Sequence, residues 1–365
     1  MDQHHGSDFP GLKTFKRYAQ SMATKTGRHV ERLGFRDVPA SRGESAHLIE
    51  CDDFYLAHVN EGLGTKNLVA DAMYGFTGRE WYRAIAQCTL ASILNDLATC
   101  GASPLTVCMH LAADNTEWFT RVERWSDFLR GWQEACDTAQ CTWGGGETPV
   151  LHGQIGSTTV VPSGSAVGII RPKSRRIAGN IQAGDAIVFL ISSGLHANGS
   201  TDARAVAANL PESYLTRLDD GRTLGEHLLT PTILYGPFIE TCLDWGVEIH
   251  YAANITGGGW TKLMRPPQPF RYVIDQVPAS LPVFEFLQLH GGLDNRTMFS
   301  TFNMGVGYAL YVPAASVGDL FTVAKEMPGD EYWLLEAGRI EDSAEPRLVI
   351  EPLKLEYDES DLTIR

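Results

Sequence analysis

Apolar residues recur three or four positions apart in two long stretches of the chain. Between Arg79 and Cys100 this spacing predicts one helix with Gly101 as its C-terminal stop, and residues 118–139 predict a second helix. Strand-like apolar runs lie at residues 54–59, 165–170, 186–192 and 304–313. This alternation of strands and helices indicates an α/β or α+β layered fold.

The length of the chain favours two domains. A single hydrophobic core stops growing beyond roughly 250–300 residues. This chain has 365 residues, of which 44% are hydrophobic and 20% charged. Residues 171–185 are charged, contain glycine and lack periodicity, which is typical of a domain junction. We therefore predict an N-terminal domain over 1–170 and a C-terminal domain over 171–365. The first ~45 residues are polar and basic and predict only a short helix and a loop.

Charge and cysteine content restrict the class of protein. The formal net charge of −14 disfavours nucleic acid and anionic membranes as partners. Residues 1–10 are polar and lack the apolar segment of a signal peptide, and no apolar run is long enough to span a bilayer. The seven cysteines are scattered without a C-x-x-C pair, which favours free thiols over disulfides or a zinc site. We expect a cytoplasmic protein.

Five segments rich in glycine and small residues follow one another along the chain. Glycine lets backbone N–H groups approach an anion closely, so the series predicts a site for ATP. Each segment alone is also compatible with a simple turn. The segments are NEGLGTK (60–66), ILNDLATCG (93–101), GGGETP (144–149), SSGLHANGS (192–200) and NITGGGW (254–260).

Charged residues in these segments add phosphate and metal chemistry. Lys66 is a candidate cation for a phosphate, and Glu61, Asp96 and Glu147 are candidate oxygen ligands for Mg²⁺. Asp96 lies near the predicted C-terminal end of a helix, where the helix dipole disfavours an anion unless a cation compensates it. A solvated surface pair with Asn95 is therefore the alternative for Asp96, and a helix-capping acid is the alternative for Glu147.

His196 precedes a helix that is predicted to begin at Ser200 or Thr201. A helix N-terminus binds anions, so His196 is a candidate contact for a phosphate, with a packing role as the alternative. The predicted catalytic residues are Lys66, Asp96 and His196. The predicted ATP- and phosphate-binding residues are Gly62, Gly64, Thr65, Lys66, Asn95, Gly145, Gly146, Glu147, Thr148, Asn198, Thr256, Gly257, Gly258 and Gly259.

Together these segments resemble the phosphoribosylformylglycinamidine cyclo-ligase family, also called aminoimidazole ribonucleotide synthetase, from Glu61 to Gly307. Further matching segments are LLTPT-x-x-Y (228–235), PVFEFLQ (282–288) and TFNMGVG (301–307). The resemblance implies two α/β domains and a homodimer in which both N-terminal domains form a central β-barrel. It also implies ATP and Mg²⁺ as cofactors and a small ribonucleotide as substrate. ATP would phosphorylate a formamide oxygen, a nitrogen would attack the activated carbon, and phosphate would leave as the imidazole ring closes.

Several positions depart from the family pattern. Glu61 stands where the family has Asp, Cys88 where it has an acidic residue, and Asn254 where it has His. Residues 42–53 also lack the glycine loop that helps form the substrate end of the family's site. Two alternatives therefore stay open. One is a related ATP-dependent kinase or ligase acting on another small molecule, and the other is a catalytically silent nucleotide-binding paralogue.

Overall fold

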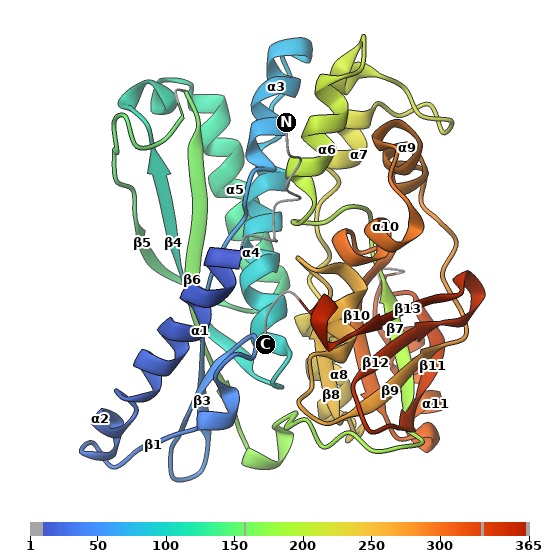
Figure 1. Ribbon diagram of the computed structural model, residues 1–365. Helices are drawn as coiled ribbons and strands as arrows, with labels where there is room; N and C mark the ends of the chain where they lie inside the picture. Colours follow the sequence, from blue (N-terminus) through green and yellow to red (C-terminus); the bar gives the residue numbers. More distant parts are fainter. Residues whose placement is uncertain (1–9, 157, 330–331, 363–365) are drawn as a thin grey trace.

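The computed structural model describes residues 10–156, 158–329 and 332–362. Over these ranges the chain forms two mixed α/β units, which lie on either side of helix α4 (Tyr82–Ala98; Figure 1). The polar N-terminal residues 1–9 lie outside the described ranges. Among the described residues, no helix combines the length and apolar character needed to cross a membrane.

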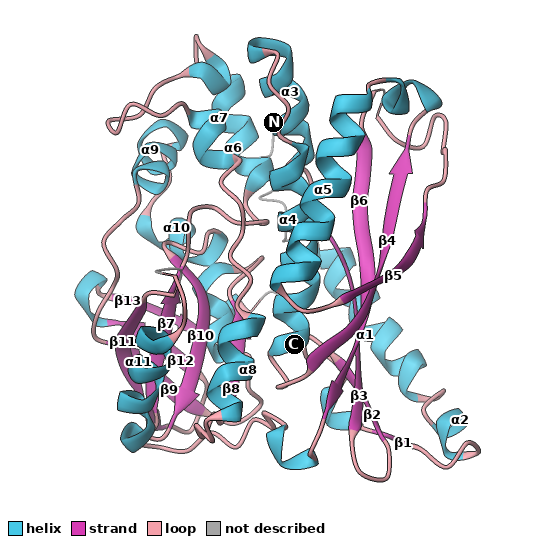
Figure 2. Ribbon diagram, turned by 180° about the vertical axis from the view of Figure 1, so that it is seen from behind, coloured by secondary structure: helices cyan, strands magenta, loops and turns pink. Residues whose placement is uncertain are grey.

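The N-terminal unit is built on a six-stranded sheet with the order β1-β2-β3-β6-β4-β5. Helices α4 and α5 pack against one face of this sheet (Figure 2). The strands are β1 (Arg36–Asp37), β2 (His47–Glu50), β3 (Tyr55–Gly62), β4 (Ser103–Ala113), β5 (Thr142–Glu147) and β6 (Val160–Ile170). The helices are α1 (Pro10–Thr24), α2 (Arg28–Glu31), α3 (Asn67–Thr77), α4 and α5 (Val122–Thr138). The segment before β2 therefore contains more regular structure than its polar sequence predicts.

Close contact between α4 and the sheet depends on glycine in β6. A Cβ atom on Gly164 would lie 3.0 Å from Ile93 Cδ1 of α4, and one on Gly168 would lie 2.7 Å from Leu97 Cδ2 of α4. Any larger residue at either position would push the helix and strands apart. Every second residue of β6 is buried, as a strand covered on one face requires.

The two predicted helices of this unit differ in outcome. The helix predicted between Arg79 and Cys100 is confirmed as α4, and Gly101 follows its end with a φ of +79°. The helix predicted over 118–139 is wrong at its start, because a 3₁₀ turn (Thr116–Thr120) and an extended Arg121 precede α5. Arg121 leaves helical geometry where its guanidinium pairs with Glu80 at 2.8 Å.

The C-terminal unit contains a seven-stranded sheet with the order β13-β12-β9-β11-β7-β10-β8. The strands predicted at 186–192 and 304–313 are confirmed as β7 and β10, and both are almost entirely buried. The strands are β7 (Ala186–Ile191), β8 (Tyr251–Asn254), β9 (Phe270–Ile274), β10 (Val306–Val312), β11 (Leu334–Asp342), β12 (Arg347–Ile350) and β13 (Leu355–Asp358). The helices are α6 (Ser200–Ala208), α7 (Leu224–Leu228), α8 (Gly236–Asp244), α9 (Pro282–Gly291), α10 (Asn295–Thr301) and α11 (Val317–Glu326).

Helix α4 also joins the two units, because polar groups along it bond to residues 230–235 of the C-terminal unit. Asn95 Nδ2 donates to the backbone oxygen of Ile233 at 2.9 Å, and Asn95 Oδ1 accepts from the backbone N–H of Tyr235 at 2.8 Å. Cys88 Sγ accepts from the backbone N–H of Thr232 at 3.3 Å. We refer to α4 together with residues 230–235 as the domain seam.

Candidate functional site

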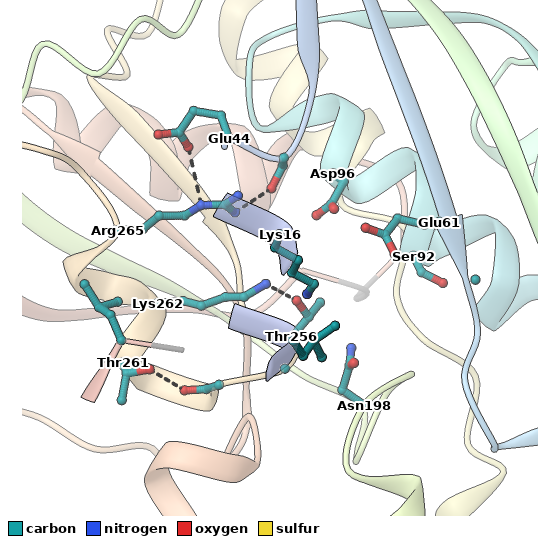
Figure 3. Close-up of a pocket in the computed structure, with 16 residues that line it drawn as sticks. Lys16, Glu44, Glu61, Ser92, Asp96, Asn198, Thr256, Thr261, Lys262 and Arg265 are labelled. Carbon is teal, nitrogen blue, oxygen red and sulfur yellow. Dashed lines mark hydrogen bonds and ion pairs between the residues drawn. The ribbon is translucent and has the colours of Figure 1, made fainter. Parts of the chain in front are cut away.

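A cavity of about 360 Å³ lies between the two units, beside the last turn of α4 (Figure 3). Its walls come from α1, the end of β3, α4, the loop after β8 and the 3₁₀ turn Gly259–Met264. The lining residues are Leu12, Lys16, Glu44, Ser45, Glu61, Gly62, Ser92, Asp96, Asn198, Thr256, Gly257, Gly258, Thr261, Lys262, Arg265 and Leu362. Segments far apart in sequence, including several of the glycine-rich ones, therefore meet in one cavity.

Two carboxylates form the acidic wall of this cavity. Glu61 is the second-to-last residue of β3, and Asp96 lies in the last turn of α4. Asp96 is buried, and its Oδ1 accepts a hydrogen bond from Asn254 Nδ2 at 2.9 Å. Desolvation by the cavity walls and the nearby Asp96 charge raise the pKa of Glu61. The alternative for Asp96, a solvated surface pair with Asn95, is wrong, because both side chains are buried.

Basic side chains lie on the opposite wall. Lys262 Nζ donates to the hydroxyl of Thr256, and burial lowers the pKa of Lys262 to about 8. Arg265 is held by its neighbours, since Nη1 donates to Ser45 Oγ at 3.0 Å and Nε lies 3.6 Å from Glu44 Oε2. Lys16 reaches into the same space from α1, between the acidic and basic walls (Figure 3).

A second cavity of about 180 Å³ adjoins the first, because Gly62, Asn198, Gly257 and Gly258 line both. Two predicted phosphate loops form its walls, the GLGT turn with Gly64 and Thr65 and the turn that precedes α6. Helix α6 begins at Ser200, as the sequence predicts. Backbone N–H groups at the start of a helix favour an anion in this smaller cavity.

Lys66 lies away from both cavities. Its side chain is fully buried, and its Nζ donates to the backbone oxygens of His196 at 2.9 Å and Thr230 at 2.8 Å. It therefore bonds to two loops of the C-terminal unit across the domain seam. The sequence identifies Lys66 as a phosphate cation because it follows two glycines, but the structure gives its ammonium group two carbonyl partners.

His196 also lies outside the lining of both cavities. Its ring is buried, its φ is +62°, and its Nε2 lies 3.2 Å from the backbone N–H of Ser193, from which it accepts. Burial and the Lys66 charge lower the pKa of His196 to about 3. The ring is therefore neutral at physiological pH and packs beside Tyr235, with their centroids 6.1 Å apart.

The segment GGGETP is not brought to the cavities within one chain. Gly145, Gly146 and Glu147 lie on β5, the outer strand of the N-terminal sheet, and are exposed, as is Thr148. In the part of the chain that the structure describes, no three His, Cys, Asp or Glu side chains are arranged to hold a metal ion. Glu147 therefore does not join Glu61 and Asp96 in a three-carboxylate site of a single chain.

Three more predicted positions have structural surroundings that the sequence does not reveal. Asn95 belongs to the domain seam, where both ends of its amide group are bonded. Gly259 is buried, and a Cβ atom there would lie 2.4 Å from the backbone oxygen of Phe299. Thr65 Oγ1 lies 3.2 Å from Thr201 Oγ1 across the two units. Thr256, Gly257, Gly258 and Asn198 do line the main cavity.

Most residues of the basic wall are absent from the site predicted from the sequence. Lys262 and Arg265 directly follow the TGGG segment and stand three positions apart, which was a usable signal for one helical face. Lys16, Glu44 and Ser45 belong to polar segments without a recognisable motif, and only tertiary structure brings them to the cavity. None of the seven cysteines forms a disulfide in the structure.

Two family models match most of the chain. Residues 43–170 match the N-terminal domain and residues 182–350 the C-terminal domain described as AIR synthase related protein. The chain is 31% identical over 313 residues to phosphoribosylformylglycinamidine cyclo-ligase of Methanocaldococcus jannaschii, covering 84% of each chain. It belongs to the phosphoribosylformylglycinamidine cyclo-ligase family.

Solved structures with low identity share the same fold. A structure described as AaThiL complexed with AMPPCP and TMP has a TM-score of 0.58 at 16% identity and covers 87% of this chain and 90% of its own. One described as T. maritima PurL complexed with FGAR has a TM-score of 0.57 at 13% identity, covering 87% of this chain and 47% of its own. These likenesses confirm the two-domain α/β fold.

Proposed function

We propose that this protein is an ATP-dependent cyclo-ligase that closes the imidazole ring of aminoimidazole ribonucleotide from formylglycinamidine ribonucleotide. The observation that carries the proposal is the interdomain cavity, where Glu61 and Asp96 face Lys262 and Arg265 beside glycine-rich loops. The curated cyclo-ligase relatives, which align over most of the chain, supply the reaction.

The chemistry makes modest demands on the side chains. An amide oxygen is a poor leaving group, and transfer of the terminal phosphoryl group of ATP to it produces a good one. The substrate nitrogen then forms the new C–N bond, and inorganic phosphate departs with that oxygen. Such a transfer needs positioning and charge neutralisation more than a covalent nucleophile. The glycine-rich loops and the basic wall of the cavity provide these two functions.

The acidic wall suits magnesium that arrives with a nucleotide. Mg²⁺ is usually held by one or two carboxylates together with phosphate oxygens and water, so Glu61 and Asp96 fit this need without a third protein ligand. Bound there, Mg²⁺ would neutralise phosphate charge during the transfer. Asn254 supports this role, because its amide holds the Asp96 carboxylate in place at 2.9 Å.

We also propose that the protein is a homodimer that functions in the cytoplasm. The N-terminal sheet keeps apolar side chains exposed on the adjacent strands β4 and β6, with Leu105 at 45% and Val161 at 46% exposure. Strand β5 is the free edge of that sheet, and it carries GGGETP. A second copy would cover this surface. Sedimentation should then report twice the chain mass of 40.1 kDa, and a monomer at micromolar concentration would contradict the dimer.

The reaction is tested by measuring ADP release with and without formylglycinamidine ribonucleotide, together with formation of the aminoimidazole product. We expect ADP release to depend on the ribonucleotide and to match product formation one to one. ADP release that other small molecules stimulate instead would favour a related kinase or ligase. ATP binding without any substrate-stimulated release would favour a silent paralogue. Neither alternative is favoured by the curated relatives, which are named as cyclo-ligases.

A further inference from the structure

The main cavity contains two lysines whose charge has no direct carboxylate partner. Among the residues that the structure describes, no Asp or Glu oxygen lies within 4.0 Å of the ammonium groups of Lys16 or Lys262. Figure 3 marks one bond from Lys262, to the Thr256 hydroxyl, and none from Lys16. An ammonium group has three donors, so both lysines keep donors that are directed into the cavity.

The other cations near the site are already engaged. Arg265 donates to Gly43 O and Ser45 Oγ and lies beside the Glu44 carboxylate. Lys66 donates to two backbone carbonyls and is fully buried. Lys262 and Lys16 are therefore the lining cations whose charge is not already balanced by a neighbouring carboxylate.

The opposite wall explains why these lysines stay unpaired. Glu61 and Asp96 are close enough to influence Lys262 electrostatically but stand across the cavity from it (Figure 3). A phosphate group between the walls would accept hydrogen bonds from the lysines. A divalent cation on that phosphate would face the carboxylates. The cavity thus has the charge distribution that a metal-bound phosphate requires.

We propose that Lys262, together with Lys16 from α1, binds a phosphate group of the ligand in this cavity, and that Lys262 takes the role which the sequence suggests for Lys66. Lys16 belongs to an exposed helix, whereas Lys262 is partly buried in the 3₁₀ turn, so Lys262 contributes the larger part. This inference rests on the proposed function in one respect: that function supplies the two ligands, ATP and the ribonucleotide substrate, whose phosphate the lysines would bind.

The test compares ligands with and without phosphate on the full-length protein. Titration calorimetry would measure MgATP against adenosine, and formylglycinamidine ribonucleotide against its riboside, for the wild type, Lys262→Gln, Lys262→Arg and Lys16→Gln. Loss of one charge-assisted contact should weaken the phosphate-bearing ligand about 10-fold to 100-fold for Lys262→Gln. Lys16→Gln should weaken it less, and Lys262→Arg should recover part of the affinity.

The ligand pair whose phosphate-bearing member loses affinity identifies the source of the phosphate. A selective loss for MgATP assigns the lysines to the nucleotide, and a selective loss for the ribonucleotide assigns them to the substrate. Lys325→Gln, on the exposed side of α11, is the matched control and should change neither. Thermal unfolding without ligand should be the same for all five proteins within about a degree or two.

Unchanged affinity for both phosphate-bearing ligands in Lys262→Gln and Lys16→Gln would overturn the proposal. Equal losses for adenosine and MgATP would also overturn it, since a general distortion would then be the cause. The readout is independent of turnover. A wild-type protein that binds phosphate through Lys262 but forms no aminoimidazole product would refute the proposed reaction and leave this assignment intact.

Discussion

Lys66 and Lys262 follow glycine-rich loops of similar appearance, yet they lie in two regions with opposite requirements. Beside the domain seam, the Lys66 ammonium group donates to two backbone carbonyls, those of His196 and Thr230. In the main cavity, Lys262 has one hydroxyl partner and faces two carboxylates across open space. The Lys66 ammonium group is matched by internal acceptors, whereas the cavity retains unmatched charge.

The difference shows what decides the role of a polar residue in such a motif. A buried carbonyl without a donor costs free energy, so a lysine that lies near two of them is used for structure. A lysine beside a cavity keeps its donors for a ligand. Each lysine directly follows a threonine just after a glycine-rich segment, and only the tertiary neighbours distinguish the two roles.

The largest expected effect of a substitution in either region is on stability, in the variant Lys66→Met. Removing the ammonium group leaves the carbonyls of His196 and Thr230 without their donor, so we expect the free energy of unfolding to fall by about 2–4 kcal/mol. Urea unfolding of Lys66→Met and of the surface control Lys325→Met would measure this. A stable Lys66→Met protein with greatly weakened ATP binding would instead return Lys66 to phosphate binding.

A smaller loss is expected for Asn95→Ala in the same seam. This change removes two hydrogen bonds, to Ile233 and Tyr235, and should lower the free energy of unfolding by about 1–3 kcal/mol. Hydrogen exchange should show faster exchange at the Tyr235 amide, which loses its acceptor. If exchange there is unchanged while MgATP affinity falls, the sequence prediction that Asn95 binds nucleotide is the better one.

In the cavity, the expected effect shifts from stability to binding. Asp96→Asn keeps an oxygen that can accept from Asn254 but removes the charge, so stability should change by less than about 1 kcal/mol. Affinity for MgATP should fall about 10-fold, because one carboxylate near the proposed metal position is lost. Titrations at fixed free Mg²⁺ would measure this. Equal ATP affinity for the variant and the wild type at matched Mg²⁺ would remove Asp96 from metal binding.

The sequence predicts the fold well because local patterns encode it. Periodicity locates α4, the small residues of β6 reflect its contact with α4, and the alternation of strands and helices gives the layered class. The start of α5 is mispredicted because the conformation of Arg121 depends on its tertiary contact with Glu80. Polar segments such as α1 are underestimated for the same reason.

The site is predicted in part. Glu61, Asp96, Asn198 and the TGGG loop meet in the main cavity, because their motifs contain the chemistry at the place where the chain turns. The role of Lys66 cannot be read from its motif, since it depends on loops 130 and 164 positions later in the chain. Lys16 and Glu44 lie in segments without any motif. Long-range contacts of this kind have no local signal.

The smallest expected effect is on the pH dependence of stability, and it concerns His250. Unlike Lys66 and Lys262, this buried side chain has direct carboxylate partners. His250 lies just before β8, and its ring bonds to Asp185 at 2.7 Å and to Glu248 at 3.0 Å. Burial alone would lower the pKa of His250, but these hydrogen bonds to carboxylates raise it above 6.5. Because the folded state holds the proton more tightly, the stabilisation is fully present below the unfolded value near 6.5 and is lost as pH rises through the folded pKa.

A single proton limits the slope of this pH dependence to about 1.4 kcal/mol per pH unit. In urea unfolding, the free energy of unfolding of the wild type should therefore fall modestly between pH 6 and pH 9. We expect a smaller fall for His250→Gln and the same fall for the control Lys325→Gln. Lys262 should contribute with the opposite sign in this range, because burial lowers its pKa to about 8 and the folded protein then holds that proton less tightly than the unfolded chain. A decline of the same size in His250→Gln would show that another group causes it, and the pairing with Asp185 would then have no measurable share in stability.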